Sequence, residues 1–372
     1  MSAFTVLREE GHARRAVYAT AHGDIHTPVF MNVATQAAMK GGLAACDLRR
    51  AGCSVVLANA YHLHLRPGED TVRSMGGLHG FMRWSGPMLT DSGGFQVYSL
   101  AGRRKITDEG AEFASHIDGA RVFIGPRESV RIQTALGADI IMAFDECVES
   151  TASREVVQSA SERTLRWLDC CIDEHGRAGQ GARALWGINQ GGVYEDIRAD
   201  NLLRLQERGL PGVAIGGLAV GEEKAAMYHI LDILCPLLHK HIPRYLMGVG
   251  TPEDILQAVS RGIDFFDCVL PARNGRHGHL YTRKGKINIK NARYRLDENP
   301  IDEQCGCEVC ALYTRAYLRH LFTCGELLAL RLGAYHNLYY YNSLMAQIRQ
   351  NLENGTFNAF RKAMTECWTS GP

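Results

Sequence analysis

The chain lacks a long apolar segment: none of its 372 residues lies in a run approaching the ~18 apolar residues that a membrane-spanning helix needs. The amino terminus lacks the pattern of a secretory signal peptide. Neither sign of charge is in excess, because 41 Lys and Arg stand against 40 Asp and Glu. We therefore expect a cytoplasmic protein without a membrane partner, and a nucleic-acid contact has to be recognised from a local cluster of basic residues.

Two patterns of other protein classes are also missing. The 12 cysteines are scattered until three of them concentrate at 305, 307 and 310, so they do not form the disulfide framework of a secreted domain. No G-x-G-x-x-G opens a helix after the first predicted strand, which disfavours a doubly wound open sheet, the alternative fold. A chain of this length suits one large domain with a smaller appendage.

Strand patterns and helix patterns alternate along most of the chain. Short apolar runs occur at 54–59, 87–90, 139–144, 184–189, 212–216, 245–247 and 265–270. Helical spacing follows at 155–175, 194–208, 222–239 and 252–261, and Thr251 and Pro252 are the residue types of an N-cap and a first helical position. Strand followed by helix, repeated this often, predicts an α/β fold with a parallel sheet, closed as a (β/α)8 TIM barrel.

Six residues that could take part in catalysis or binding stand at the carboxyl ends of predicted strands: Asp91, Asp145, Gln190, Gly217, Leu218 and Asp267. In a barrel these positions meet at the face that holds active sites. Two facing carboxylates suit retaining glycosyl transfer, one as nucleophile and one as proton carrier. A third carboxylate with an amide side chain suits the donors and acceptor of a guanine edge. Barrel lyases and isomerases use the same residue types, so the pattern alone leaves the reaction open.

Asp267 interrupts an otherwise apolar strand. A carboxylate in such a run is costly unless it is paired or used, so it is either a nucleophile or base, or a strand-end group that fixes loop amides. Pro271 should end the strand, and Arg273, Arg276 and His277 among glycines indicate a mobile cationic loop. Eight Lys or Arg and no acidic residue lie between 273 and 295, which favours contact with RNA bearing an unstacked base over a merely solvated strand face.

Cys305, Cys307 and Cys310 are the clearest metal signal. Three thiolates this close indicate a structural zinc knuckle that takes a fourth ligand from further along the chain. The candidates for that ligand are His320, Cys324 and His336. His62 and His64 at a strand end support an alternative, a zinc-dependent barrel hydrolase, but no further His or Asp ligand set appears on the later strands.

Several longer motifs together resemble the bacterial tRNA-guanine transglycosylases, also called queuine tRNA-ribosyltransferases. They are LTDSGGFQV at 89–97, FDEC at 144–147, NQGG at 189–192, GGLAVGE at 216–222, YLMGVG at 245–250, FDCVLP at 266–271, RNGR at 273–276 and the cysteine triplet with its downstream histidine. The resemblance covers nearly the whole chain. It implies a single (β/α)8 barrel over residues 1–372, with a small zinc-binding insertion at about 283–345 near the carboxyl terminus.

The reaction that the resemblance implies is a base exchange, in which guanine at the wobble position of tRNAs with a G-U-N anticodon is replaced by the queuine precursor preQ1. Asp267 would be the nucleophile that forms a covalent ribosyl intermediate, and Asp91 the general acid and base. The base would be held by Asp145, Gln190, Gly217 and Leu218 and sandwiched by Phe95 and Met247. The RNA would be faced by Arg273, Asn274, Gly275 and Arg276, and one structural Zn2+ would be held by Cys305, Cys307, Cys310 and His336.

Single residues within the motifs refine the implied substrate. Cys147 and Val220 match members that accept preQ1 rather than the bulkier queuine. Ala272 replaces an expected threonine, and Phe95 replaces a tyrosine found in some members, which bears on fine tuning rather than on activity. The implied partners are the anticodon loop of tRNA, preQ1 as substrate and guanine as product, and no redox or nucleotide cofactor is implied.

The family also implies a homodimer. Its contacts are expected around Tyr313, Tyr317 and His320, whose spacing is equally compatible with packing against the barrel. A non-catalytic tRNA-binding subunit is the remaining alternative within this family. Such a subunit should have lost some of the aspartates at 91, 145 and 267, and this chain has all three.

Overall fold

Eight parallel strands form a closed barrel in the computed structural model, which describes residues 3–94, 104–179 and 183–371. Around the barrel they follow the order β4 (Val29–Val33), β5 (Val56–Ala58), β6 (Met88–Thr90), β10 (Ile140–Met142), β11 (Ala184–Asn189), β12 (Val213–Ile215), β13 (Arg244–Leu246) and β14 (Phe265–Cys268). The last strand, β14, closes on the first, β4, with Asp267 opposite Met31. The predicted (β/α)8 fold is confirmed, and the doubly wound open sheet is wrong.

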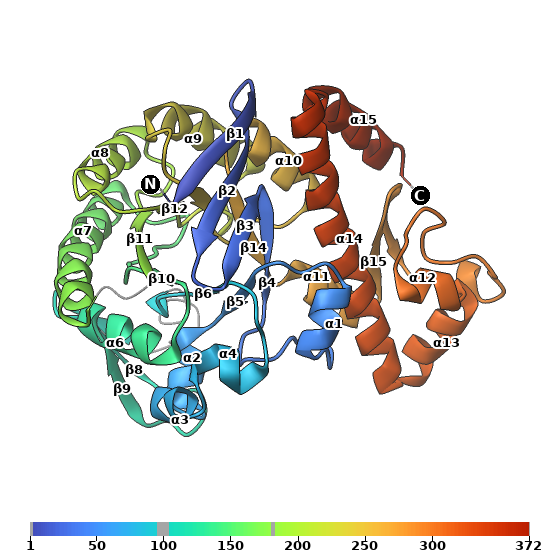
Figure 1. The fold of residues 1–372 in the computed structure, drawn as a ribbon, viewed down its shortest axis with the longest axis horizontal. Helices are drawn as coiled ribbons and strands as arrows, with labels where there is room; N and C mark the ends of the chain where they lie inside the picture. The colour runs from blue at the N-terminus through green and yellow to red at the C-terminus, as the bar shows by residue number, and fades with distance from the viewer. Residues whose placement is uncertain (1–2, 95–103, 180–182, 372) are drawn as a thin grey trace.

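Helices connect the strands and surround the barrel (Figure 1). They are α1 (Ala45–Arg50), α2 (Ala60–Leu65), α3 (Glu69–Ser74), α4 (Gly77–Met82), α6 (Pro126–Leu136), α7 (Arg154–Arg177), α8 (Glu195–Gln206), α9 (Lys224–Leu237), α10 (Pro252–Ser260) and α11 (Leu270–Arg276). The four predicted helices appear as α7 to α10, and the Thr251 side chain caps α10 by accepting the Asp254 N–H. Among the described residues, no helix is both long and apolar enough to cross a membrane.

A small antiparallel sheet closes the amino-terminal mouth of the barrel. It consists of β1 (Phe4–Glu10), β2 (Ala13–Thr20) and β3 (Gly23–Thr27). Tyr18 of β2 meets Trp186 and Phe265 of the barrel edge to face, with ring centroids 5.4 and 6.3 Å apart, and all three side chains are buried. Apolar side chains thus fill the barrel interior at this end, and the carboxyl ends of the strands form the opposite mouth, where barrels of this kind place their active sites.

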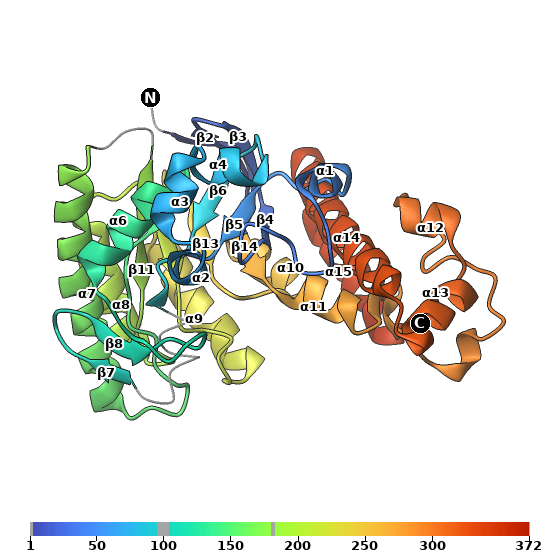
Figure 2. The same cartoon turned by 90° about the horizontal axis from the view of Figure 1, so that it is seen from below.

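Two further groups of elements extend the barrel. The strands β7 (Arg104–Ile106), β8 (Ala111–Ala114) and β9 (Arg121–Ile124) form an antiparallel sheet between β6 and α6. After α11 come β15 (His279–Thr282), β16 (Gly285–Asn288), η1 (Ala292–Tyr294), α12 (Glu308–Leu312), α13 (Arg315–Cys324), α14 (Leu327–Asn354) and α15 (Phe357–Ser370). The long helix α14 packs against α11, β4 and β15, and Figures 1 and 2 place α12 and α13 on its side away from the barrel.

The segment after Asp267 differs from the sequence prediction. Arg273 and Arg276 lie on α11 rather than in a mobile loop, and β14 already ends at Cys268. Pro271 stands in the first turn of α11, where its missing N–H costs nothing. The glycine at 275 is explained by close packing of two helices, since a Cβ on Gly275 would lie 2.4 Å from the Gly333 carbonyl oxygen of α14.

Gly275→Ala should lower the free energy of unfolding by about 1–3 kcal/mol, the usual cost of overpacking. The added methyl group would overlap the Gly333 carbonyl and push α11 away from α14. Gly176→Ala is the matched control, because Gly176 also lies in a helix, α7, and its Cβ would meet no heavy atom within 4 Å. In urea unfolding the control should equal or exceed wild type by up to about 1 kcal/mol. Equal stability of Gly275→Ala and wild type would contradict the close packing.

Candidate active site and metal centre

Asp267 lies near the end of β14, at the carboxyl-terminal mouth of the barrel. Its Oδ1 accepts the Tyr245 hydroxyl and the Gly248 backbone N–H, each at 2.7 Å. Tyr245 belongs to the neighbouring strand β13 and is buried. Burial raises the pKa of Asp267, and the two hydrogen bonds oppose that rise. The carboxylate is therefore held in one orientation by neutral donors.

Asp91 directly follows β6 and is oriented by the start of α2. Its Oδ1 accepts the Ala60 N–H at 2.9 Å, and its Oδ2 accepts the side-chain amide of Asn59. Asn59 is also the N-cap of α2, where its Oδ1 accepts the His62 N–H at 2.9 Å. One turn thus supplies both of these donors, and they orient the second carboxylate of the site.

The charges of both carboxylates affect the pKa of Tyr245. Burial raises the pKa of Tyr245 well above its usual value, and the negative charges of Asp267 and Asp91 raise it further. The phenol therefore stays protonated at neutral pH and remains a donor to Asp267. Two strands, β4 and β5, separate β14 from β6 around the barrel, so the two carboxylates approach the mouth from different directions.

Asp145 and Gln190 form a buried polar pair at the same mouth. Gln190 Nε2 donates to Asp145 Oδ2 at 2.7 Å, and the Ser92 hydroxyl donates to Asp145 Oδ1 at 3.2 Å. Burial raises the pKa of Asp145 to about 6, although both hydrogen bonds lower it. An ionised carboxylate has more lone pairs than these two donors occupy, so Asp145 can also accept N–H groups of a ligand.

Glycines allow the backbone to approach this pair closely. A Cβ on Gly217 would lie 2.3 Å from Gln190 Oε1, and one on Gly94 would lie 2.7 Å from Asp145 Oδ1. Gly217 also has a φ of +63°, a conformation that other residues rarely adopt. Any side chain at 217 would therefore displace the amide that holds Asp145.

The remaining residues expected around a bound base are placed in part. Met247 follows β13, and a Cβ on Gly216 would lie 3.5 Å from its Sδ, which puts the thioether beside the Gly216–Gly217 backbone. Leu218 is buried two residues beyond Gly216. Phe95, the expected second half of a base sandwich, lies outside the described residues.

The four residues expected to face RNA lie on α11 but point in different directions. Arg273 is exposed, Asn274 donates to the Tyr281 hydroxyl at 2.8 Å, and Gly275 packs against α14. A cavity of about 190 Å³ beside Cys268 is lined by Lys40, Arg273 and Arg276, among others. A cationic hollow therefore adjoins the residue next to Asp267, although the loop predicted there is a helix.

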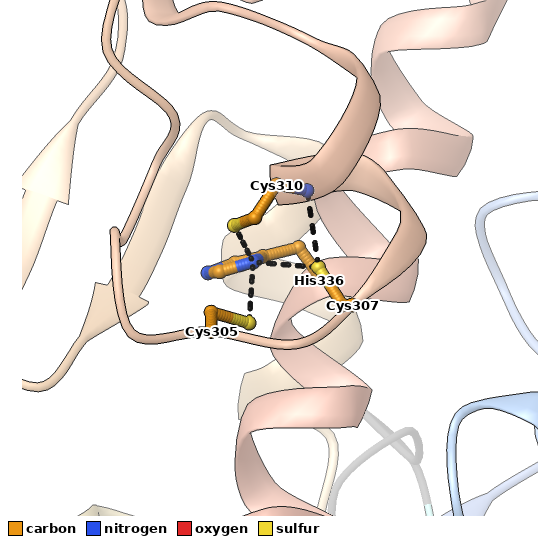
Figure 3. Close-up of side chains that lie close together, drawn as sticks. All are labelled: Cys305, Cys307, Cys310 and His336. Carbon is orange, nitrogen blue, oxygen red and sulfur yellow. Dashed lines mark hydrogen bonds between the residues drawn. The ribbon is translucent and has the colours of Figure 1, made fainter.

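Cys305, Cys307, Cys310 and His336 gather into one group, as predicted (Figure 3). The three sulfurs lie 3.9, 3.5 and 3.4 Å from His336 Nδ1 in that order. His336 Nε2 donates to the Tyr281 carbonyl oxygen at 2.7 Å, which leaves the Nδ1 lone pair facing the thiols. Three sulfur donors and one imidazole nitrogen can hold a metal ion in a closed, four-ligand shell.

The helix that carries His336 also holds the segment after Asp267. Asn337, the next residue on α14, donates to the carbonyl oxygens of Pro271 and His279, each at 3.0 Å. Its Oδ1 accepts the Tyr281 N–H, also at 3.0 Å. Both residues are buried, so α14 connects the metal-ligand group to α11 and β15.

The structure also places the other residues that were considered as metal ligands. His320 and Cys324 lie near each other on α13, with Nδ1 and Sγ 3.6 Å apart, and Cys324 is exposed. His64 pairs with Glu69 at 2.7 Å. Within residues 3–94, 104–179 and 183–371, neither His62 nor His64 belongs to a group of three or more metal-ligating side chains. His336 is the fourth member of the cysteine group.

Three positioning residues were missed by sequence reasoning: Asn59, Ser92 and Tyr245. Asn59 ends a predicted strand and could have been grouped with the other strand-end residues. Ser92 and Tyr245 stand inside quoted motifs, but the direction of each side chain depends on the register and twist of the closed barrel. A residue pattern does not contain that information.

The fold and the site define a class: a (β/α)8 barrel with two fixed carboxylates at its carboxyl-terminal mouth and a separate Cys3His metal-ligand group. The family model described as Queuine tRNA-ribosyltransferase matches residues 9–370. The chain is 55% identical over 371 residues to the Queuine tRNA-ribosyltransferase of Clostridium perfringens (strain SM101 / Type A), with 98% of each chain covered. It is 54% identical to that of Clostridium botulinum strain Hall, covering 98% of this chain and 99% of the relative. The chain therefore belongs to the queuine tRNA-ribosyltransferase family.

Asp145→Asn should raise the free energy of unfolding at pH 7 and leave it nearly unchanged near pH 4. The folded-state pKa of about 6 exceeds the ~3.9 of an unfolded aspartate, so ionising Asp145 costs stability. This cost is absent below about pH 4, grows as the pH rises to about 6 and then stays constant, at up to about 3 kcal/mol. Urea unfolding over this pH range measures the difference. Asp173→Asn, at an exposed position on α7, is the control, and a pH-independent difference for Asp145→Asn would contradict the assignment.

Proposed function

We propose that the protein is a tRNA-guanine transglycosylase that exchanges guanine at the wobble position of G-U-N anticodon tRNAs for preQ1. The observation that carries this proposal is Asp267, held by Tyr245 and Gly248 at the barrel mouth of a chain that belongs to this family. Relatives 54–55% identical to it carry the name Queuine tRNA-ribosyltransferase. The reaction is then a pentosyl transfer with retention at the anomeric carbon.

The first half of the exchange breaks the bond between ribose and guanine. An Asp267 carboxylate oxygen attacks C1′, the C1′–N9 bond breaks, and its electron pair leaves on guanine. Asp91 donates a proton to the departing base, so guanine leaves neutral and the ribose is esterified to Asp267. The Tyr245 O–H and the Gly248 N–H orient Asp267 as the nucleophile and stabilise its charge before attack.

The second half reverses these roles. The incoming preQ1 loses its N9 proton to Asp91 and attacks C1′ with the freed electron pair, and the ester bond to Asp267 breaks. Two inversions at C1′ give net retention. Asn59 and Ala60 hold the Asp91 carboxylate in the orientation that both proton transfers need. Each carboxylate regains its starting protonation state at the end of the cycle.

The Asp145 pair suits the recognition of a guanine-like edge. Guanine presents N–H donors at N1 and N2 and an acceptor at O6. Asp145, mostly ionised at neutral pH, accepts the donors, and the Gln190 amide with the backbone of Gly217 and Leu218 serves the remaining polar atoms. Met247 and Phe95 would cover the two faces of the ring. The Cys147 and Val220 side chains favour preQ1 as the incoming base.

The surface beside Asp267 suits a polyanion. We assign the α11 segment of Arg273, Asn274, Gly275 and Arg276 to contact with the RNA. Arg273 and Lys40, which line the cationic cavity, would contact phosphates. We assign residues of about 283–345 to an insertion that carries the remaining basic residues of this region. A homodimer with contacts around Tyr313 and Tyr317, whose rings stack 5.4 Å apart, completes the proposal.

Zinc is the ion that suits the Cys3His group. Three thiolates and one imidazole match the ligand set of closed structural zinc sites, and the Tyr281 carbonyl fixes the tautomer that coordinates through Nδ1. With four protein ligands the site keeps no open position for a substrate. The ion would stabilise the elements between β15 and α14, and it would take no part in the base exchange.

Asp267→Asn should abolish incorporation of radiolabelled guanine into unmodified tRNA bearing a G-U-N anticodon, because an amide oxygen is a poor nucleophile. Wild type should incorporate guanine, and preQ1 should compete with it. Retained tRNA binding by the variant is the control for folding. Exchange at the wild-type rate in Asp267→Asn would refute the nucleophile. A wild-type protein that binds the tRNA but exchanges no guanine would favour the non-catalytic subunit instead.

Purified wild-type protein should contain about one zinc ion per chain, and Cys307→Ala and His336→Ala should lose it. Cys324→Ala and His320→Ala are the matched controls, because these residues have the same chemistry but pair with each other on α13. Elemental analysis measures the zinc, and thermal unfolding should show a lower midpoint for the two ligand variants alone. Zinc loss in a control together with retention in His336→Ala would contradict the ligand set.

A further inference from the structure

Among the described residues, a second group brings three metal-ligating side chains together: His22, His79 and Asp139. His22 lies in the turn between β2 and β3, His79 lies on α4, and Asp139 directly precedes β10. These are amino-terminal positions of the barrel, so the group lies at the end closed by β1 to β3, opposite Asp267. Nothing in the proposed base exchange uses it.

The three side chains converge on one small space. His22 Nδ1 lies 2.7 Å from Asp139 Oδ1, and His79 Nε2 lies 3.4 Å from Asp139 Oδ2. The two imidazole rings stack, with centroids 3.5 Å apart and planes inclined by 13°. The three ligand atoms all lie within 4.8 Å of one another. Donors roughly 2.0–2.2 Å from one ion are themselves separated by roughly 3–4 Å, so small shifts of the exposed His22 suffice.

The environment suits an exchangeable ion. The Asp139 side chain is 1% exposed and that of His79 is 13% exposed, whereas the His22 side chain is 39% exposed. Two ligands are therefore held in place by the barrel, and the third is at the surface, where an ion can enter. The Met88 N–H fixes Asp139 Oδ2 at 2.9 Å, and in the metal-free protein His79 Nε2 donates to the Gly86 carbonyl oxygen at 3.1 Å.

We propose that His22, His79 and Asp139 bind one divalent first-row transition-metal ion, distinct from the ion of the Cys3His group. Two imidazole nitrogens and carboxylate oxygen suit ions such as Zn2+, Co2+ and Ni2+, whereas the cysteine group offers mainly sulfur. Binding takes His22 through Nδ1 and His79 through Nε2, with each ring neutral and its proton on the other nitrogen. In the free protein these two nitrogens carry the protons, since His22 Nδ1 donates to Asp139 and His79 Nε2 donates to the Gly86 carbonyl oxygen, so the ion replaces both hydrogen bonds.

Binding of an ion at this site should connect three separate elements of the fold. The ion would tie the tip of the β2–β3 hairpin to α4 and to the start of β10, which are joined here through three side chains. Figure 2 shows the hairpin and α4 on the same side of the barrel. Since the ion binds the folded chain and not the separated ligands, it should raise the midpoint of thermal unfolding as its concentration rises.

The test is calorimetric titration of Co2+ into full-length protein dialysed until one zinc ion per chain remains, in the cysteine group. Wild type should bind one Co2+ per chain without the strong absorption of cobalt–thiolate bonds, so the cysteine group remains occupied by zinc. His22→Gln should lose this equivalent and the accompanying rise in the unfolding midpoint. His22 is the primary variant because its exposed turn tolerates substitution, and His79→Gln should behave in the same way.

His229→Gln is the matched control. His229 also pairs with a carboxylate, Glu195, at 2.7 Å, but both side chains are exposed and no second imidazole joins them. The control should keep the Co2+ equivalent. If wild type binds no Co2+ beyond its zinc, or if His22→Gln binds it as wild type does, the three residues form a hydrogen-bonded cluster only, and the proposal is wrong.

Discussion

The site depends on burying carboxylates beside neutral hydrogen-bond donors. Asp267 takes a phenol and a backbone N–H, and Asp145 takes an amide and a hydroxyl. A cation at either place would neutralise the charge and lower the reactivity of the oxygen it contacts. Neutral donors fix the orientation of each carboxylate while its negative charge remains available. The cost of burying that charge appears as a raised pKa for both Asp145 and Asp267. The rest of the fold supports this costly arrangement.

Closure of the opposite mouth is part of that support. The packing of Tyr18 on Trp186 and Phe265 fills the lower barrel with apolar side chains, so β11 and β14 are packed from below, and β13 pairs with β14. Tyr245 stands on this packed layer with its hydroxyl toward Asp267. A rigid strand pair is what lets one phenol position a carboxylate to within a hydrogen-bond length. The aromatic layer and the polar mouth are therefore opposite ends of the same closed barrel.

The sequence was sufficient for the architecture and for the grouping of the three aspartates, for identifiable reasons. Repeated strand–helix units and polar strand ends place Asp91, Asp145 and Asp267 at one mouth because parallel strands share a direction. Local rules also located the cap at Thr251. They failed where tertiary packing decides: glycines around Arg273 suggested a loop, but contact with α14 makes the segment a helix. Local spacing likewise left His320, Cys324 and His336 open as the fourth ligand, and only the family resemblance selected His336, because spacing does not show which helix returns to the cysteines.

Two neighbouring residues of α14 connect the cysteine group to α11. His336 faces the three sulfurs, and Asn337 donates to the backbone of Pro271 in the first turn of α11 and of His279 after its end. If this group binds an ion, its loss would let the short elements between β15 and α13 open locally while the barrel stays folded. Asn337 would pass that loosening to the cationic surface first. Oxidation of one thiol of this group would therefore disturb the cationic surface before it disturbs the carboxylates, which places the chain's sensitivity to oxidants beside its basic residues.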